Sequence, residues 1–149
     1  MATPQDPAIV ICPACGAANR VPADRLDAAP ACGKCKTALF TGEPHGVGLA
    51  GFERHVRKGS LPVLVDFWAD WCAPCKAMAP AFAEAARSLE PQFRLLKVDT
   101  EAAPQVAAAC EIHSIPTLIL FVGGKEVARR SGSIPASAII QWVRGALSG

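Results

Sequence analysis

The sequence predicts an α/β domain with a partly parallel sheet, preceded by a small segment that a metal or disulfides must hold together. Three observations lead to this prediction. Residues 46–149 alternate strand-like and helix-like segments. A nearly continuous apolar run spans 62–68, as in a central strand covered on both faces. The first 45 residues hold four of the seven cysteines and show no sustained periodicity.

The first segment is too short to bury a core of its own. Below about 40 residues a fold usually needs a staple, which its cysteines would supply. Residues 42–46, Gly-Glu-Pro-His-Gly, are predicted to be a linker. We therefore divide the chain into residues 1–43, the cysteine-stapled segment with its linker, and residues 44–149, the α/β domain.

The α/β domain begins with a short helix over 49–58 and the apolar strand over 62–68. This strand contains one acidic residue, Asp66, which is therefore expected to be buried. A helix is predicted from Cys72 to Leu89, with a kink at Pro80. The helix thus begins at a Cys-x-x-Cys pair.

Later segments continue the alternation. Residues 93–98 form a strand and 104–110 a short helix opened by proline. Strands 117–122 and 125–130 flank Gly123-Gly124, a turn that tolerates positive φ, so they form an antiparallel hairpin.

A last helix follows Pro135. Its Ile139, Val143 and Leu147 lie four residues apart and are expected on one face of the helix.

The pair Cys72 and Cys75 is placed for redox chemistry. Unpaired N–H groups and the helix dipole stabilise a thiolate at Cys72, whereas Cys75 lies one turn further in, where we expect it to be more buried. Cys72 would attack a substrate disulfide, and Cys75 would resolve the mixed disulfide, leaving a Cys72–Cys75 disulfide. Pro74 stiffens the spacer. The alternative is half of a zinc site.

Several separated motifs from about residue 46 to the C-terminus resemble the thioredoxin family in order and spacing. They are Asp66-Phe-Trp-Ala-Asp-Trp-Cys-Ala-Pro-Cys-Lys76, Lys97-Val-Asp99, Ser114-Ile-Pro-Thr117 and Gly123-Gly124. The resemblance implies a thioredoxin fold, a central mixed sheet flanked by helices, and a protein-disulfide reductase. A protein disulfide oxidase or isomerase is the alternative activity.

Two charged residues acquire roles through this resemblance. Asp66 matches the buried carboxylate that accepts the proton of the second cysteine, and Lys97 matches the lysine beside it. Desolvation raises the pKa of a lone aspartate in an apolar strand, which suits proton transfer near neutral pH. The alternative for Asp66 is a structural role at a strand end.

The substrate-binding rim also follows from the resemblance. Pro116 matches the family's cis-proline, which leaves the backbone of Ile115 free to pair with an extended substrate. Trp71 and Gly132 would complete an apolar rim with the spacer residues between the cysteines. The spacer, Ala73-Pro74, departs from the family at Ala73, where glycine is usual, so the redox potential is left open.

The first segment contains Cys12-Pro-Ala-Cys15 and Cys32-Gly-Lys-Cys35. Two such pairs sixteen residues apart have the spacing of a four-thiolate structural zinc site, and no organic cofactor is expected. Iron or two further redox dithiols are the alternatives. A zinc ribbon before a thioredoxin domain resembles the thioredoxin 2 branch of the family.

The ribbon itself leaves three roles open: structure, a redox response through oxidation of the zinc thiolates, or a binding module. Nucleic acid is not expected as a partner, because residues 1–45 hold four basic and four acidic residues and form no basic patch. The resemblance implies thioredoxin reductase and disulfide-containing proteins as partners.

Further expectations concern location and assembly. No secretory signal or membrane span is visible in the sequence, so we expect a cytoplasmic protein. We also expect a monomer. Cys110 is left unassigned.

Overall fold

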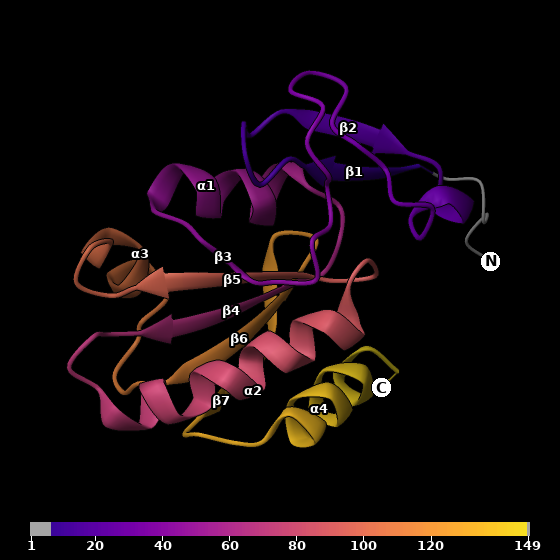
Figure 1. Cartoon of the computed structure of the whole chain (residues 1–149). Coiled ribbons are helices and arrows are strands. Elements are labelled where there is room, and N and C mark those ends of the chain that lie inside the picture. Colours follow the sequence, from indigo (N-terminus) through magenta and orange to yellow (C-terminus); the bar gives the residue numbers. More distant parts are fainter. Residues whose placement is uncertain (1–6, 149) are drawn as a thin grey trace.

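A computed structural model describes residues 7–148, and its centre is a five-stranded mixed sheet (Figure 1). In spatial order the strands are β3 (His45–Gly46), β5 (Arg94–Asp99), β4 (Val63–Trp68), β6 (Thr117–Val122) and β7 (Lys125–Ser131). The first three run parallel, whereas β6 and β7 are antiparallel to their neighbours. The predicted α/β fold with a partly parallel sheet is confirmed.

Strand β4 lies at the centre because its side chains are apolar on both faces. Leu64 packs into a core with helices α2 (Ala73–Leu89) and α4 (Ala136–Ser148). Val63 and Val65 point the other way, into a second core under the remaining helices. Since side chains alternate along a strand, Asp66 shares the face of Leu64, toward α2.

Two further helices, α1 (Leu49–Glu53) and α3 (Pro104–Ala109), cover the second face (Figure 1). A π-helical turn, Arg54–Lys58, continues α1. Helix α2 runs from 73 to 89 with Pro80 inside it, so the expected kink does not divide the helix.

The predicted face of α4 is only partly buried. Ile139 and Val143 are fully buried, but Leu147 is 43% exposed because it lies in the last turn of the helix.

The turn between β6 and β7 has the predicted chemistry. Gly123 and Gly124 have φ values of 62° and 81°, which glycine adopts without strain. The two residues join the strands of the expected hairpin.

A small ribbon precedes the sheet. Strand β1 (Ala8–Ile11) pairs antiparallel with β2 (Ala18–Val21), and a 3-10 turn, Ala23–Arg25, follows. The sequence showed no strand here, because four-residue strands are too short for a clear alternation. The apolar side chains of the ribbon pack around Leu39, and Leu61 from the larger part of the chain completes this cluster.

Buried charges fasten the ribbon to the sheet. Arg94 Nη2 donates to the carbonyl oxygens of Ile11 (3.1 Å) and Leu39 (2.9 Å). Its Nη1 lies 3.0 Å from Glu90 Oε2, and Glu90 Oε1 accepts from Gly42 N at 2.9 Å. The predicted linker is thus held in place, and its last two residues form β3.

Candidate active site and metal centre

The first turn of α2 carries Cys72 and Cys75. Cys72 is the N-cap residue, and its Sγ accepts a hydrogen bond from the Cys75 N–H at 3.2 Å. Pro74 fits the first turn because an N–H there has no partner inside the helix. The two sulfurs form a disulfide, with Cα atoms 5.2 Å apart. After reduction the same N–H and the helix dipole would stabilise a thiolate at Cys72.

Burial does not distinguish the two cysteines as expected. Each is 3% exposed, so Cys75 is not the more buried residue, because the disulfide holds both sulfurs against the same helix start. Position relative to the surface does distinguish them. Cys72 lines a surface groove of about 490 Å³, whereas Cys75 does not. Of the two cysteines, only Cys72 therefore borders the groove.

The opposite wall of the groove is the loop before β6. The Ile115–Pro116 peptide bond is cis, and the Ile115 carbonyl oxygen lies 3.7 Å from Cys72 Sγ. Gly132, with φ of 97°, donates its N–H to the Pro116 carbonyl at 2.9 Å. Neither Pro116 nor Gly132 is among the residues that line the groove.

The residues that line the groove beside Cys72 were only partly predicted from the sequence. Trp71, Ala73, Pro74 and Ile115 line the groove as expected. The remaining groove residues come from α3 and its flanking loops: Thr100, Ala107, Ile112, His113 and Ser114. Their only sequence signal is proximity to Pro116, and Thr100 and Ala107 lack even that.

Trp71 forms the exposed rim of the groove. Its side chain is 68% exposed, yet its Nε1 donates to Glu101 Oε2 at 2.7 Å. The hydrogen bond fixes the orientation of a large apolar surface beside Cys72. Glu101 was not predicted from the sequence.

Asp66 is buried on β4, on the side of the sheet that α2 covers. The residue is 1% exposed, and among residues 7–148 neither carboxylate oxygen has a hydrogen-bond partner. Burial raises the pKa of Asp66 to about 7, and the nearby charge of Lys97 opposes this rise. Lys97 is the register partner of Asp66 on β5, and its Nζ lies 4.9 Å from the Trp68 ring centroid.

The four ribbon cysteines form a second site. The sulfurs of Cys12, Cys15, Cys32 and Cys35 all lie within 4.8 Å of one another. Cys12 and Cys35 are 3.6 Å apart, and Cys15 and Cys32 are 3.7 Å apart. Zn–S bonds of about 2.3 Å in a tetrahedron place sulfurs about 3.8 Å apart, so these residues fit a zinc ion.

Polar groups around the sulfurs complete this site. The backbone N–H groups of Ala14 and Lys34 donate to Cys12 and Cys32 Sγ, each at 3.4 Å. Thr37 Oγ1 lies 3.0 Å from Cys35 Sγ, and Asn19 Nδ2 lies 3.6 Å from Cys32 Sγ. Neither Asn19 nor Thr37 was predicted from the sequence, although both are polar residues close to a metal-binding pair.

Comparison with protein families identifies the family in which such a cysteine pair and a four-cysteine cluster occur together. A family model described as Thioredoxin matches residues 45–145. The chain belongs to the thioredoxin family. A zinc-ribbon model described as Thioredoxin 2, N-terminal, matches residues 11–37. The Cys72–Cys75 disulfide occupies the place of the thioredoxin active site, and the ribbon model with its four-cysteine cluster supports zinc binding.

Thioredoxins from distant organisms are similar to this chain. Thioredoxin C-3 of Corynebacterium nephridii is 44% identical over 91% of this chain and 92% of its own length. The chloroplastic M-type thioredoxin of Chlamydomonas reinhardtii is 36% identical over 83% of this chain and 90% of its own. The structure of a mutant thioredoxin from Halobacterium salinarum covers 72% of this chain and 93% of its own, with a TM-score of 0.64 and 27% identity. These relatives imply thiol-disulfide oxidoreductase activity.

Membrane insertion through a helix finds no support in the part of the chain that the structure describes. None of its helices combines the length and the apolar character that a bilayer span requires.

Proposed function

We propose that this protein reduces disulfide bonds in other proteins by dithiol exchange through Cys72 and Cys75. The observation that carries the proposal is the placement of Cys72 at the N-cap of α2, lining a groove whose opposite wall presents the Ile115 carbonyl. A disulfide sulfur laid in that groove would meet a helix-stabilised thiolate.

Two exchange steps transfer two electrons to the substrate. The Cys72 thiolate attacks one substrate sulfur and forms a mixed disulfide, and the other substrate sulfur leaves as a thiolate. The Cys75 thiol loses its proton and attacks Cys72 Sγ. The Cys72–Cys75 disulfide forms, and the substrate sulfur that was bonded to Cys72 leaves as a thiolate.

Asp66 is the group we propose as acceptor of the Cys75 proton. It lies on the α2 side of the sheet, and its pKa of about 7 allows it to exist in both protonation states near neutral pH. Lys97 lies beside it and favours the charged carboxylate. Because Asp66 has no other hydrogen-bond partner within residues 7–148, its carboxylate is available for this role.

Substrate proteins would bind as extended segments along the groove. The Ile115 backbone, ahead of Pro116, would pair with the substrate chain. Trp71, Ala73 and Pro74 would supply apolar contacts on the side of Cys72. Gly132 would support the loop through its bond to Pro116.

The ribbon cysteines Cys12, Cys15, Cys32 and Cys35 would hold one zinc ion in a structural role. With four thiolates the ion has no open position for substrate, and its contribution is to hold the ribbon folded. The division at residues 43 and 44 remains our prediction. We further propose thioredoxin reductase as the electron donor, a cytoplasmic location and a monomeric state.

Insulin reduction driven by NADPH and thioredoxin reductase tests this function. We expect Cys72→Ser to lower turnover by more than about 10³-fold, because the attacking thiolate is lost. A Cys12→Ser/Cys15→Ser double variant should keep most of the activity and serves as the control. Full activity of Cys72→Ser would overturn the mechanism. Faster oxidation of a reduced protein than reduction of insulin would favour an oxidase.

A further inference from the structure

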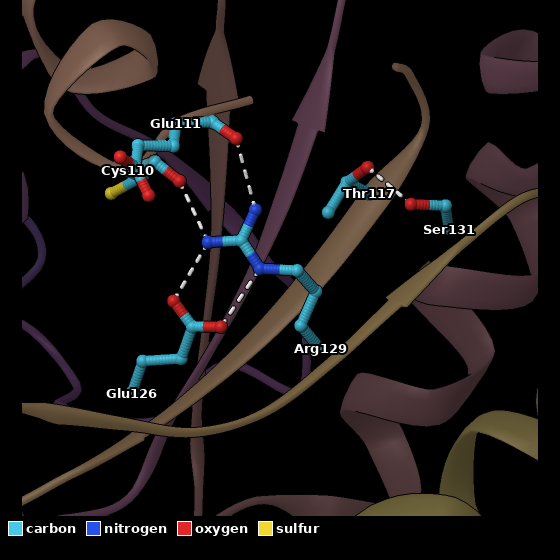
Figure 2. Close-up of polar contacts among 6 residues, drawn as sticks. All are labelled: Cys110, Glu111, Thr117, Glu126, Arg129 and Ser131. Atoms are coloured by element: carbon cyan, nitrogen blue, oxygen red, sulfur yellow. Dashed lines mark hydrogen bonds and ion pairs between the residues drawn. The ribbon is translucent and has the colours of Figure 1, made fainter. Parts of the chain in front are cut away.

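Arg129, on the outer strand β7, reaches across to the C-terminal end of α3 (Figure 2). Its Nη2 donates to the carbonyl oxygen of Cys110 at 2.7 Å, and its Nη1 donates to that of Glu111 at 3.1 Å. Glu126, three residues earlier on the same strand, accepts from Nε at 2.8 Å and from Nη2 at 2.7 Å. The guanidinium is therefore held on two sides.

The carbonyl groups of Cys110 and Glu111, at and just beyond the end of α3, suit such a cation. Cys110 is the C-cap residue, and Glu111 takes a φ of 53°, the left-handed conformation that ends helices. Carbonyl groups in the last turn of a helix lack partners inside the helix and carry partial negative charge, which a cation stabilises. Arg129 supplies both the donors and the charge.

The loop that starts at this point forms one wall of the substrate groove. Residues 112–115 follow Glu111 directly, and all of them line the groove. Strand β7 also holds the far end of this loop. Thr117 Oγ1 donates to the Ser114 carbonyl at 2.6 Å and lies 2.9 Å from Ser131 Oγ on β7 (Figure 2).

We propose that Arg129 is a positioning residue for protein substrates: it fixes the start of the groove loop without touching the reacting sulfurs. This inference rests on the proposed reductase function. A protein disulfide needs the loop as a binding wall, whereas a small disulfide can reach Cys72 without it. Loss of Arg129 should therefore weaken the binding of protein substrates and leave the chemistry at Cys72 intact.

Arg129 is a suitable site for substitution because its removal leaves the core unchanged. The side chains of Arg129 and Glu126 are 32% and 37% exposed, and ion pairs at such positions contribute little to folding stability. Arg130 provides a matched control. It is the next residue on β7, it is exposed, and in the described part of the chain its side chain makes no hydrogen bond or ion pair.

The experiment follows the reaction of pre-reduced protein with insulin and with the small disulfide dithiobis-nitrobenzoate. For Arg129→Met we expect the insulin concentration at half-saturation to rise about 3- to 10-fold, the effect of losing charge-assisted hydrogen bonds. The limiting rate, the reaction with the small disulfide and the Cys72–Cys75 potential should stay unchanged. Arg129→Lys should recover part of the loss, and Arg130→Met should behave as wild type. Amide hydrogen exchange over residues 112–115 should quicken only in the Arg129 variants.

Two results would overturn the inference. One is an Arg129→Met variant that matches Arg130→Met in half-saturation and in exchange over residues 112–115. The other is an equal loss toward insulin and the small disulfide, which would indicate a general defect. Failure of the wild type to reduce either compound would refute the proposed function instead, and the exchange comparison would still decide whether Arg129 holds the loop.

Discussion

The redox pair and the ribbon site are built from the same Cys-x-x-Cys spacing, yet their surroundings differ. In the ribbon each cysteine of one pair lies opposite a cysteine of the other, at 3.6 and 3.7 Å. Cys72 and Cys75 pair only with each other among the described cysteines and instead begin a long helix beside a groove. The chemistry of a Cys-x-x-Cys pair therefore depends on the groups that surround it. Paired sulfurs suit a metal, whereas a helix start beside a groove suits electron transfer.

The two buried charges of the sheet show a parallel contrast. Arg94 is paired with Glu90 and two ribbon carbonyls, so it fastens the ribbon to β5. Asp66 is equally buried but has no hydrogen-bond partner within residues 7–148. A paired charge stabilises an interface, whereas an unpaired one keeps a pKa suited to proton exchange.

Removal of the metal should produce the largest difference between the two sites, because it should affect the ribbon and leave the redox domain folded. Structural zinc contributes roughly 10 kcal/mol or more to the folding of small zinc modules, so a chelator should unfold the ribbon. The redox domain should keep its fold and most of its insulin reduction. Circular dichroism and insulin turnover before and after chelation check this expectation. Loss of activity in proportion to lost zinc would contradict the separation.

Substitution of Arg94 should have the next largest effect. Arg94→Met leaves Glu90 buried without its partner, which should lower the free energy of unfolding by about 3 kcal/mol. The control is the double variant Arg94→Met/Glu90→Met. It removes the unpaired charge of Glu90 and should recover part of the lost free energy of unfolding. Urea unfolding measures stability, and limited proteolysis of the ribbon measures its attachment. Equal stability of wild type and Arg94→Met would show that the contact fastens nothing.

Asp66 should destabilise the oxidised protein at neutral pH. Below about pH 4 both states hold the proton, but as pH rises toward 7 only the unfolded state ionises, so the native state loses stability. Asp66→Asn should therefore raise the free energy of unfolding by about 4 kcal/mol at pH 8 and leave it nearly unchanged at about pH 3. Resolution of the mixed disulfide should be slower in this variant.

The exposed Asp70, next to the active site, is the control for Asp66. Asp70→Asn should leave both unfolding curves unchanged, because its side chain is 89% exposed. An Asp66→Asn variant with the stability of wild type at pH 8 would refute the raised pKa.

Thr37 should have the smallest effect. Thr37→Val keeps the shape of the side chain but removes the hydroxyl beside two zinc-site sulfurs, which should weaken zinc affinity about 10-fold. Competition with a chelating dye measures the affinity. Unchanged affinity would show that the hydroxyl does not act on the sulfurs.

Local patterns in the sequence predicted most of the fold. The apolar run at 62–68, the glycine turn and the cysteine spacings are such patterns. What sequence reasoning missed depends on residues far apart along the chain. Arg94 binds carbonyls of Ile11 and Leu39, and Thr100 and Ile112 meet only at the groove. The equal burial of Cys72 and Cys75 also depends on tertiary packing, which helix position alone does not determine.

Stepwise oxidation of the zinc-loaded, reduced protein tests the division between the two sites most directly. The protein receives one equivalent of a disulfide oxidant, and zinc release and the disulfides formed are then measured by a dye and by peptide mass mapping. We predict a Cys72–Cys75 disulfide with zinc retained at Cys12, Cys15, Cys32 and Cys35. Disulfides within the ribbon and loss of zinc before Cys72 and Cys75 are oxidised would contradict the account.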